Sequence, residues 1–512
     1  MASPKKKRIG VASPSGARDR LSDLPDFLLG HVLSFLPTKE AGRTAELSRR
    51  WRDVFCNVQT VSFAERQGAR AKDWTTFYYE AQEQKSCSAL LLDDVWNALL
   101  CRCRCARAHV PLHRLRVAFD DCHWWNEHHV NQWLSYVLRH SSQELHLDLR
   151  FQLGPVCARK PYGRHGRKGE DAWYEMPRNL YSCAVLRSLR LSYCLLNLPD
   201  AAINLPFLET LHLTAVDVGS GTCCVERLIA SCPRLVDLTL ESDTGVERVS
   251  VLDRRLRRFA LRCCHEVESV DIDASELISL DYCGPVPEEE FLSLHGAQGT
   301  IMSCTVDFCK VLSKEPEFAR FRGFMEKFSG VKHLHLHHRR LPARSFQVFP
   351  SFPNLTRVAL QGPLLSPDAV RQILEQTPSL EILSLFMERP VVPDDSDNDD
   401  ESVSDEFTAQ SIPDELTAPD EFTTQSIPDE LTAPDESSFS IPCLQHRVKE
   451  INMVHYEGDR LQGMMAKLLF RNALVLERFC VVLVKGPFAL QDGLKKEIES
   501  WVVAADAEPI FL

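Results

Sequence analysis

The sequence predicts an α/β fold in which short N-terminal helices precede a solenoid of stacked strand units. Three patterns lead to this prediction: an amphipathic helical stripe near the N-terminus, a leucine-based repeat through most of the chain, and similar strand patterns near the C-terminus. The 512 residues are 44% hydrophobic, which is enough to build folded cores. Collagen-like and wholly disordered chains are therefore excluded.

The N-terminal stripe predicts an amphipathic helix. Apolar residues recur every four positions at Leu24, Leu28, Val32 and Leu36, and Leu29 and Leu33 widen the stripe. Pro37 stops this helix and Thr38 can cap the next. Two or three helices of this size are too small for a robust core, so we expect apolar surface to remain for a partner. Docking of the stripe on the rest of the chain is the alternative.

A leucine-based repeat of the form L-x-x-L-x-L occupies the middle of the chain. Eight copies begin 21–27 residues apart, except at one gap of 54 residues. They are Leu186/Leu189/Leu191, Leu208/Leu211/Leu213, Leu235/Leu238/Leu240, Leu256/Phe259/Leu261, Leu277/Leu280/Tyr282, Val331/Leu334/Leu336, Leu355/Val358/Leu360 and Leu380/Leu383/Leu385. A degenerate copy at Ile301/Cys304/Val306 would divide the gap, and weaker copies begin at Leu112 and Ser142. Each copy predicts a short strand followed by a helix or irregular return, and stacked units would share one core.

One copy carries a more specific pattern. Leu186, Leu189, Leu191, Cys194 and Leu196 match the full signature of a leucine-rich repeat. The array therefore resembles a leucine-rich-repeat solenoid, which implies a curved, horseshoe-like stack of units.

The net charge of −12 originates in one segment. Pro390–Pro442 holds sixteen acidic residues and no Lys, Arg or His, which leaves the other 459 residues at +4. Within it, Asp405–Pro419 is repeated almost unchanged as Asp420–Pro434. Because such a segment repels itself and has little apolar surface to bury, we expect a disordered insert.

The strand pattern returns after the acidic segment. Val448/Ile451/Met453 and Leu476/Phe479/Val481 fit the same three-anchor template, with a helical stripe between them. A final amphipathic helix carries Leu494, Ile498 and Trp501. The sequence therefore predicts a strand–helix–strand unit and a cap that extend the solenoid, with the acidic segment as a loop out of a continuous array.

Residues Arg20 to Phe55 closely resemble a plant-type F-box. The resemblance lies in Leu24-Pro25, Leu28-Leu29, Pro37-Thr38-Lys39 and Trp51. Phe27 departs from the family's usual glutamate, and we expect it to face solvent. The resemblance implies docking on a Skp-type adaptor and, through it, a cullin–RING ubiquitin ligase. It assigns that contact to the positions Leu24, Pro25, Leu28, Leu29, Val32, Leu33 and Trp51.

Residues Cys443 to Trp501 resemble the FBD domain, through Val448-Lys449-Glu450-Ile451 and 472–477. The three modules occur in the order of the plant F-box/FBD/leucine-rich-repeat family. We therefore predict a basic flexible tail at 1–18, an F-box at 19–58, a helical connector at 59–110, leucine-rich repeats at 111–388, an acidic insert at 389–442 and an FBD-like domain at 443–512.

The sequence contains no catalytic motif. A phosphate-binding G-x-x-x-x-G-K-[S/T] loop, a G-x-S-x-G nucleophile motif and an H-E-x-x-H metal motif are all missing. Cys101, Cys103 and Cys105 lack the paired spacing of a zinc site, so we interpret them as buried thiols. His333, His335 and His337 fall on one strand face, where a solvated surface is favoured over a metal or pH-sensing site. We expect no enzyme activity, cofactor or metal.

The location of the protein is predicted from its termini and charge. The start of the chain is basic and polar, without a secretory leader, so the nineteen cysteines are expected to be reduced. Lys5-Lys6-Lys7-Arg8 resembles a nuclear localisation signal and could equally be a solubilising tail. We predict the nucleus, the cytoplasm or both, with neither membrane nor nucleic acid as partner.

The family resemblance implies a substrate-recognition adaptor of an SCF-type (Skp–cullin–F-box) ligase, which holds a target protein for ubiquitination. The expected target surface is the outward strand face at Arg190, His212, Thr239, Ala260, Asp281, His335, Ala359 and Ser384. This mixture does not identify the target. Two alternatives remain: a non-ligase interaction scaffold, and a metal or redox sensor built on the Cys and His clusters.

Overall fold

The computed structural model describes residues 21, 23–64, 81–104, 111–119, 126–140, 142–149, 174–199, 203–218, 224–242, 245–252, 255–296, 300–388, 441–484, 488–504 and 506–512. The chain divides into two compact units, Met1–Phe328 and Ser329–Leu512. Each is described by itself.

The first unit begins with the helices α1 (Asp26–Leu33), α2 (Thr38–Arg43) and α3 (Arg49–Phe55), with the short 3-10 helix η1 (Thr44–Glu46) before α3. Pro25 and Pro37 directly precede α1 and α2. The expected capping role of Thr38 is wrong, because Thr38 is the first residue of α2. Its buried hydroxyl accepts a hydrogen bond from the backbone N–H of Ser62 at 2.7 Å. This bond ties the helices to the first strand.

The main sheet of the first unit is a parallel stack. Its order is β1-β2-β3-β4-β5-β6-β8-β10-β12. The strands are β1 (Thr60–Ala64), β2 (Arg114–Ala118), β3 (Glu144–Asp148), β4 (Ser188–Ser192), β5 (Thr210–Thr214), β6 (Asp237–Glu241), β8 (Arg258–Arg262), β10 (Ser279–Gly284) and β12 (Ser303–Phe308). The repeat anchors are buried, as Leu189 and Leu191 show at 1% exposure each. The degenerate and upstream copies are confirmed, since they form β12, β2 and β3.

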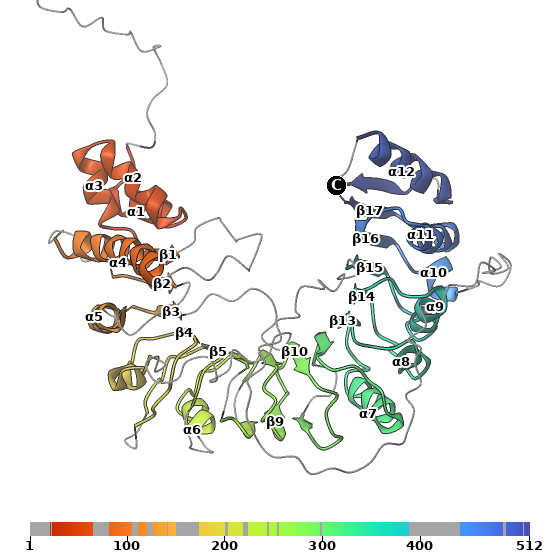
Figure 1. Cartoon of the computed structure of the whole chain (residues 1–512), viewed down its shortest axis with the longest axis horizontal. Helices are drawn as coiled ribbons and strands as arrows, with labels where there is room; N and C mark the ends of the chain where they lie inside the picture. The colour runs from red at the N-terminus through yellow and green to blue at the C-terminus, as the bar shows by residue number, and fades with distance from the viewer. Residues whose placement is uncertain are drawn as a thin grey trace, which may run out of the picture. The chain divides into compact units, whose positions relative to one another are not determined.

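The returns between these strands are mixed. The helices are α4 (Ala81–Arg104), α5 (Glu127–Arg139), α6 (Cys224–Ala230) and α7 (Glu315–Glu326), with the 3-10 helix η5 (Arg178–Ser182). Helices α4, α5 and α6 lie on one side of the strands (Figure 1). From β6 to β12 a second parallel sheet, β11 (Leu292–His295), β9 (Ser269–Asp273) and β7 (Arg248–Val251), forms part of the returns. We did not predict this sheet. Strand β1 is also new, because it lies in the segment expected to be a helical connector.

The second unit is again a parallel stack. Its strands pair in chain order: β13 (His333–His337), β14 (Arg357–Gly362), β15 (Ile382–Met387), β16 (Glu450–Tyr456), β17 (Arg478–Leu483) and β18 (Glu508–Phe511). Its helices are α8 (Arg344–Gln347), α9 (Pro367–Glu375), α10 (Pro442–His446), α11 (Arg460–Asn472) and α12 (Phe488–Trp501), on one side of the strands (Figure 1). The predicted strand–helix–strand unit is β16, α11 and β17, and β18 adds an unpredicted strand.

Strands β15 and β16 pair directly in parallel, with Leu383 opposite Ile451 and Leu385 opposite Met453. The predicted continuity of the array across the acidic segment is therefore confirmed. The acidic residues themselves, like the basic Lys5–Arg8 run, lie outside the described residues. No helix in the described ranges is long and apolar enough to cross a membrane.

Candidate functional site

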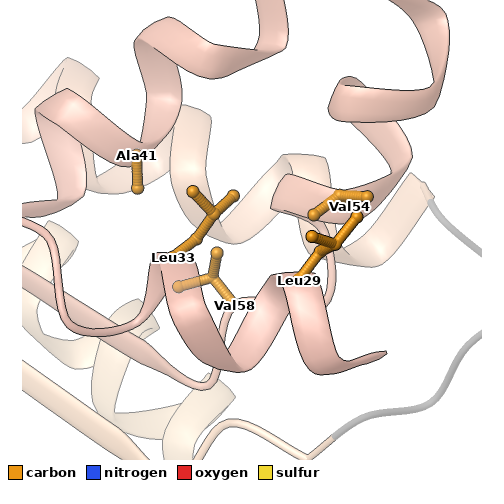
Figure 2. Packing of buried hydrophobic residues seen from close by; sticks show 5 residues of the cluster. All are labelled: Leu29, Leu33, Ala41, Val54 and Val58. Atoms are coloured by element: carbon orange, nitrogen blue, oxygen red, sulfur yellow. The ribbon is translucent and has the colours of Figure 1, made fainter. Parts of the chain in front are cut away.

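The N-terminal helices enclose a small core of their own. Leu29, Leu33, Ala41, Val54 and Val58 form it (Figure 2). Leu24, Trp51 and Phe55 pack against it from the side and are partly buried. Helix α1 approaches the residues after α3 so closely that a Cβ on Gly30 would lie 2.7 Å from the carbonyl oxygen of Asn57. Glycine is therefore needed at that position.

Two of the predicted contact residues are buried in this core. Leu29 is 1% exposed and Leu33 is 4% exposed, so neither side chain offers surface to a partner. They lie on the inner side of α1. The apolar stripe is wide enough to cover two sides of the helix, so part of it faces the core and part faces solvent. Leu29 and Leu33 hold α1 against α3. Leu24 and Trp51 also pack against this core and are half-buried.

The outer side of α1 and the turn that follows carry an apolar surface. Leu28, Val32, Phe35 and Leu36 are 39%, 46%, 76% and 44% exposed, and Pro25 is exposed at the start of the helix. The spacing from Leu28 to Val32 to Phe35 and Leu36 follows one helix face. We call these five residues the apolar surface. Phe27 is 59% exposed, as predicted.

Of the predicted contact residues, Pro25, Leu28 and Val32 lie on this surface. Leu36 was predicted only as part of the apolar stripe, and Phe35 was not predicted at all. Both could have been found, because they extend the period of Leu28 and Val32 by one more turn. An ion pair fixes the start of α1: Arg50 Nε lies 2.9 Å from Asp26 Oδ1, and the Arg50 guanidinium also donates to the carbonyl of Leu24.

The predicted target face is formed by strand register. In the first unit Arg190, His212, Thr239, Ala260 and Asp281 lie opposite one another on successive strands of the main sheet. In the second unit His335, Ala359 and Ser384 do the same on β13, β14 and β15. Within each unit the chosen residues therefore form one row on the outward strand face.

The row continues beyond the predicted residues. Arg116 on β2 and His146 on β3 precede Arg190 in the same register. Asn452 on β16 follows Ser384 and its side-chain amide donates to the Ser384 hydroxyl at 3.2 Å. The repeat pattern holds the signal for all three, since each lies between two inward anchors.

Ion pairs neutralise much of this face around β6 and β10. Arg258 Nε lies 2.9 Å from Asp237 Oδ2, and His212 Nε2 lies 3.4 Å from the other oxygen of Asp237. Burial opposes ionisation of Asp237, yet hydrogen bonds from His212 and Arg258 hold its pKa below the usual value. Arg262 pairs with Asp281 in the same way.

The cysteine and histidine clusters were placed as follows. Cys101 and Cys103 lie on helix α4, where they are half-exposed and exposed, so our interpretation of them as buried thiols is wrong. The absence of zinc-site spacing argues against a metal, but it does not show that a thiol on a helix is buried. Cys105 lies outside the described residues. His333, His335 and His337 share one half-buried strand face, as predicted. Across the described part of the chain, no three His, Cys, Asp or Glu residues gather so as to hold a metal ion.

Two family models match the chain. The F-box domain model matches residues 21–61, which contain the N-terminal helices. The model of the leucine-rich repeats of FBD-associated F-box protein At5g56370 matches residues 130–290.

Curated relatives come from Arabidopsis thaliana. F-box/LRR-repeat protein At4g14103 is 25% identical over 72% of this chain and 92% of its own length. F-box/FBD/LRR-repeat protein At1g13780 is 27% identical over 73% of this chain and 79% of its own length. In its F-box and its repeats the chain is similar to plant F-box/FBD/leucine-rich-repeat proteins. It is thus an F-box adaptor-type protein, and its F-box implies binding to a Skp-type adaptor.

Proposed function

We propose that this F-box protein is the substrate-recognition adaptor of an SCF-type E3 ubiquitin ligase. The F-box docks on a Skp-type adaptor, the adaptor connects it to a cullin–RING ligase, and the strand face of the repeats holds a target protein. The observation that carries this proposal is the apolar surface of the F-box, which remains exposed although the helices already have a complete core.

The size of the apolar surface suits a protein partner. The exposed fractions of Leu28, Val32, Phe35 and Leu36 together equal about two whole side chains. Full burial of one such side chain contributes about 1.5–3 kcal/mol, so covering this surface would contribute about 3–6 kcal/mol. An exposed apolar patch of this kind marks an interaction site in an otherwise soluble fold. The proposal requires no catalytic residue in this chain, because the ligase acts by holding the target near the loaded enzyme.

The alternative is a scaffold in which the F-box only covers the first strand of the repeats. The bond between Thr38 and Ser62 supports such a covering role, but it is made by a buried side chain and leaves the apolar surface of α1 and the following turn exposed. Covering the strand and docking on an adaptor are therefore compatible in one F-box. The scaffold differs in one measurable respect, which is that it binds no Skp-type adaptor.

Co-purification of the intact chain with a Skp-type adaptor tests the proposal. We expect wild type to retain the adaptor and Leu28→Asp with Val32→Asp to lose it, because two charges would be buried at the contact. Leu461→Asp is the matched control, since Leu461 is 57% exposed on α11 and lies outside the F-box. Adaptor capture that is absent in wild type, or undiminished in the double variant, would refute the proposal.

The subcellular location of the protein is also a proposal. We propose the nucleus, the cytoplasm or both, because the Lys5–Arg8 run resembles a nuclear signal and because thiols such as Cys183 and Cys304, which form no disulfide, suit a reducing compartment. A fluorescent fusion with and without Lys5→Ala, Lys6→Ala and Lys7→Ala tests this, and equal nuclear signal in both would remove the run from consideration.

A further inference from the structure

The outward face of the main sheet in the first unit has two electrostatically different halves. Around β6, β8 and β10 its arginines are neutralised, since Arg258 pairs with Asp237 and Arg262 with Asp281. On β2 and β4 the situation is different. Arg116 and Arg190 are exposed, and neither forms an ion pair with any residue the structure describes.

Strand register brings these two free arginines together. Arg116 lies opposite His146, and His146 lies opposite Arg190. Neighbouring strands are about 4.8 Å apart, so the two arginines stand about 10 Å apart on either side of His146. Two long arginine side chains that start from backbones at that separation can reach one phosphoryl group or neighbouring carboxylates.

The acidic groups nearby do not cancel this charge. Glu144 on β3 is already occupied by Arg114 Nε and by His113, whose Nε2 lies 3.2 Å away. Asp148, on the same face at the end of β3, also takes part in an interaction of its own. Both carboxylates are thus engaged, and Arg116 and Arg190 keep their charge.

The pKa of His146 is affected by these nearby charges. Burial is the main reason that the pKa of His146 falls to about 4, and Arg190, Arg114 and Arg116 together outweigh the opposing effect of Glu144. The imidazole is therefore neutral in the free protein at pH 7, and the arginines add to the cost of charging it. A bound anion reverses the effect of these charges.

We propose that Arg116, His146 and Arg190 form an anion-binding site for an acidic or phosphorylated linear peptide segment of the target. This proposal rests on the proposed function, whose substrate class it specifies. A peptide is favoured over a nucleic acid because only two arginines without an ion pair stand together and no Phe, Tyr or Trp side chain stands in the row from Ser62 to Asp281 to stack bases. A longer nucleic-acid backbone would need many more free cations.

Fluorescence polarisation on the intact chain tests the site. The probe is a fluorescein-labelled twelve-residue peptide of glycine, serine and four glutamates with one central phosphoserine. Its unphosphorylated form, a form with glutamine for glutamate, and labelled oligouridylate of twelve nucleotides complete the set. We expect the phosphoserine peptide to bind most tightly, the unphosphorylated acidic peptide more weakly, and the glutamine form not at all.

Charge-matched variants locate the binding. Arg116→Gln with Arg190→Gln should weaken binding of the phosphoserine peptide by about tenfold or more, because two charge-assisted contacts are lost. Arg248→Gln with Arg257→Gln removes the same charge from two other exposed arginines of the first unit and should change binding less than twofold. Bound peptide should also raise the pKa of His146, measured by NMR on the histidine ring.

Three results would overturn the proposal: equal binding of the glutamine peptide, undiminished binding in Arg116→Gln with Arg190→Gln, or tighter binding of oligouridylate than of every peptide. Adaptor co-purification separates this failure from that of the ligase function. If the arginine variant keeps the adaptor but wild type binds no anionic peptide, only this site is refuted. If wild type binds the peptide through the arginines but no adaptor, the site stands and the ligase function fails.

Discussion

The substitution Leu29→Ala tests whether the F-box has an inner and an outer face, as the structure indicates. Leu29 is 1% exposed within a core of five residues. Removal of a buried leucine side chain costs about 2–5 kcal/mol, because the lost burial adds to the cavity that remains. A unit as small as the F-box helices rarely has more than about 3–5 kcal/mol of stability. Leu29→Ala should therefore leave the helices close to unfolding.

Phe35→Ala is the matched substitution on the outer face. Phe35 is 76% exposed, so the change should alter the free energy of unfolding by less than about 0.5 kcal/mol. Adaptor binding should nevertheless weaken by about 5- to 30-fold, since burial of that exposed fraction contributes about 1–2 kcal/mol. The two variants thus lose adaptor binding for different reasons. Leu29→Ala reduces the folded fraction, and Phe35→Ala removes contact area.

Hydrogen–deuterium exchange of peptides covering residues 26–43 separates these causes. In Leu29→Ala the amide exchange of α1 should rise about 30-fold or more, and saturating adaptor should restore protection because it binds only the folded helices. In Phe35→Ala exchange should stay at the wild-type rate. Wild-type exchange in Leu29→Ala, or unfolding in Phe35→Ala, would refute the assignment of the two faces. A double substitution at Leu28 and Leu29 could not distinguish them.

Three further predictions concern the second unit. Replacement of Pro390–Ser440 by twelve Gly/Ser residues changes the net charge from −12 to +4 and should lower the entropic cost of loop closure by about 1.3 kcal/mol. The amides of β16 should stay protected from hydrogen exchange, and loss of that protection would contradict the β15–β16 pairing. Gly362→Ala should destabilise this unit by about 1–3 kcal/mol in urea titration, because a Cβ at φ +153° would lie 2.8 Å from the ring of buried His338. Burial lowers the pKa of His338 to about 4. The neutral imidazole therefore contributes its full stability above pH 6.5, and up to about 3 kcal/mol of the free energy of unfolding is lost as the pH falls to 4. His338→Gln should flatten this dependence of stability on pH.

The repeat strands could be predicted because burial imposes them locally. Each strand needs buried anchors two residues apart, such as Leu189 and Leu191, and this pattern can be recognised within a single repeat. The first strand followed the same rule at Val61 and Phe63, but it was overlooked because it directly follows the F-box pattern. The second sheet was missed for a different reason. Strands β7 and β9 carry buried anchors at the same spacing, Val246/Val249/Val251 and Val267/Val270/Ile272, but valine leads them and they fall between the leucine-based copies.

The two leucine pairs of the F-box show the limit of periodicity. Leu28 and Leu29 are neighbours in one apolar stripe, yet one faces solvent and the other the core. A hydrophobic pattern identifies which helix is amphipathic, but it cannot divide a wide stripe between the helix's own core and a partner. That division depends on where α3 packs. The family resemblance cannot separate the two leucines either, because it assigns the whole motif to the adaptor contact.

Ion pairing on the strand face is harder still to predict from the sequence. Arg190 and Arg258 both lie on outward positions of repeat strands, and nothing in their local sequence separates them. Arg258 is neutralised because register places it opposite Asp237, whereas Arg190 has His146 and His212 as its neighbours. A residue's charge therefore becomes available to a ligand only through what stands on the next repeat. For this fold, the target chemistry is set by register between repeats, and changing Thr239 to Asp would not neutralise Arg190 two strands away, while His212→Asp would.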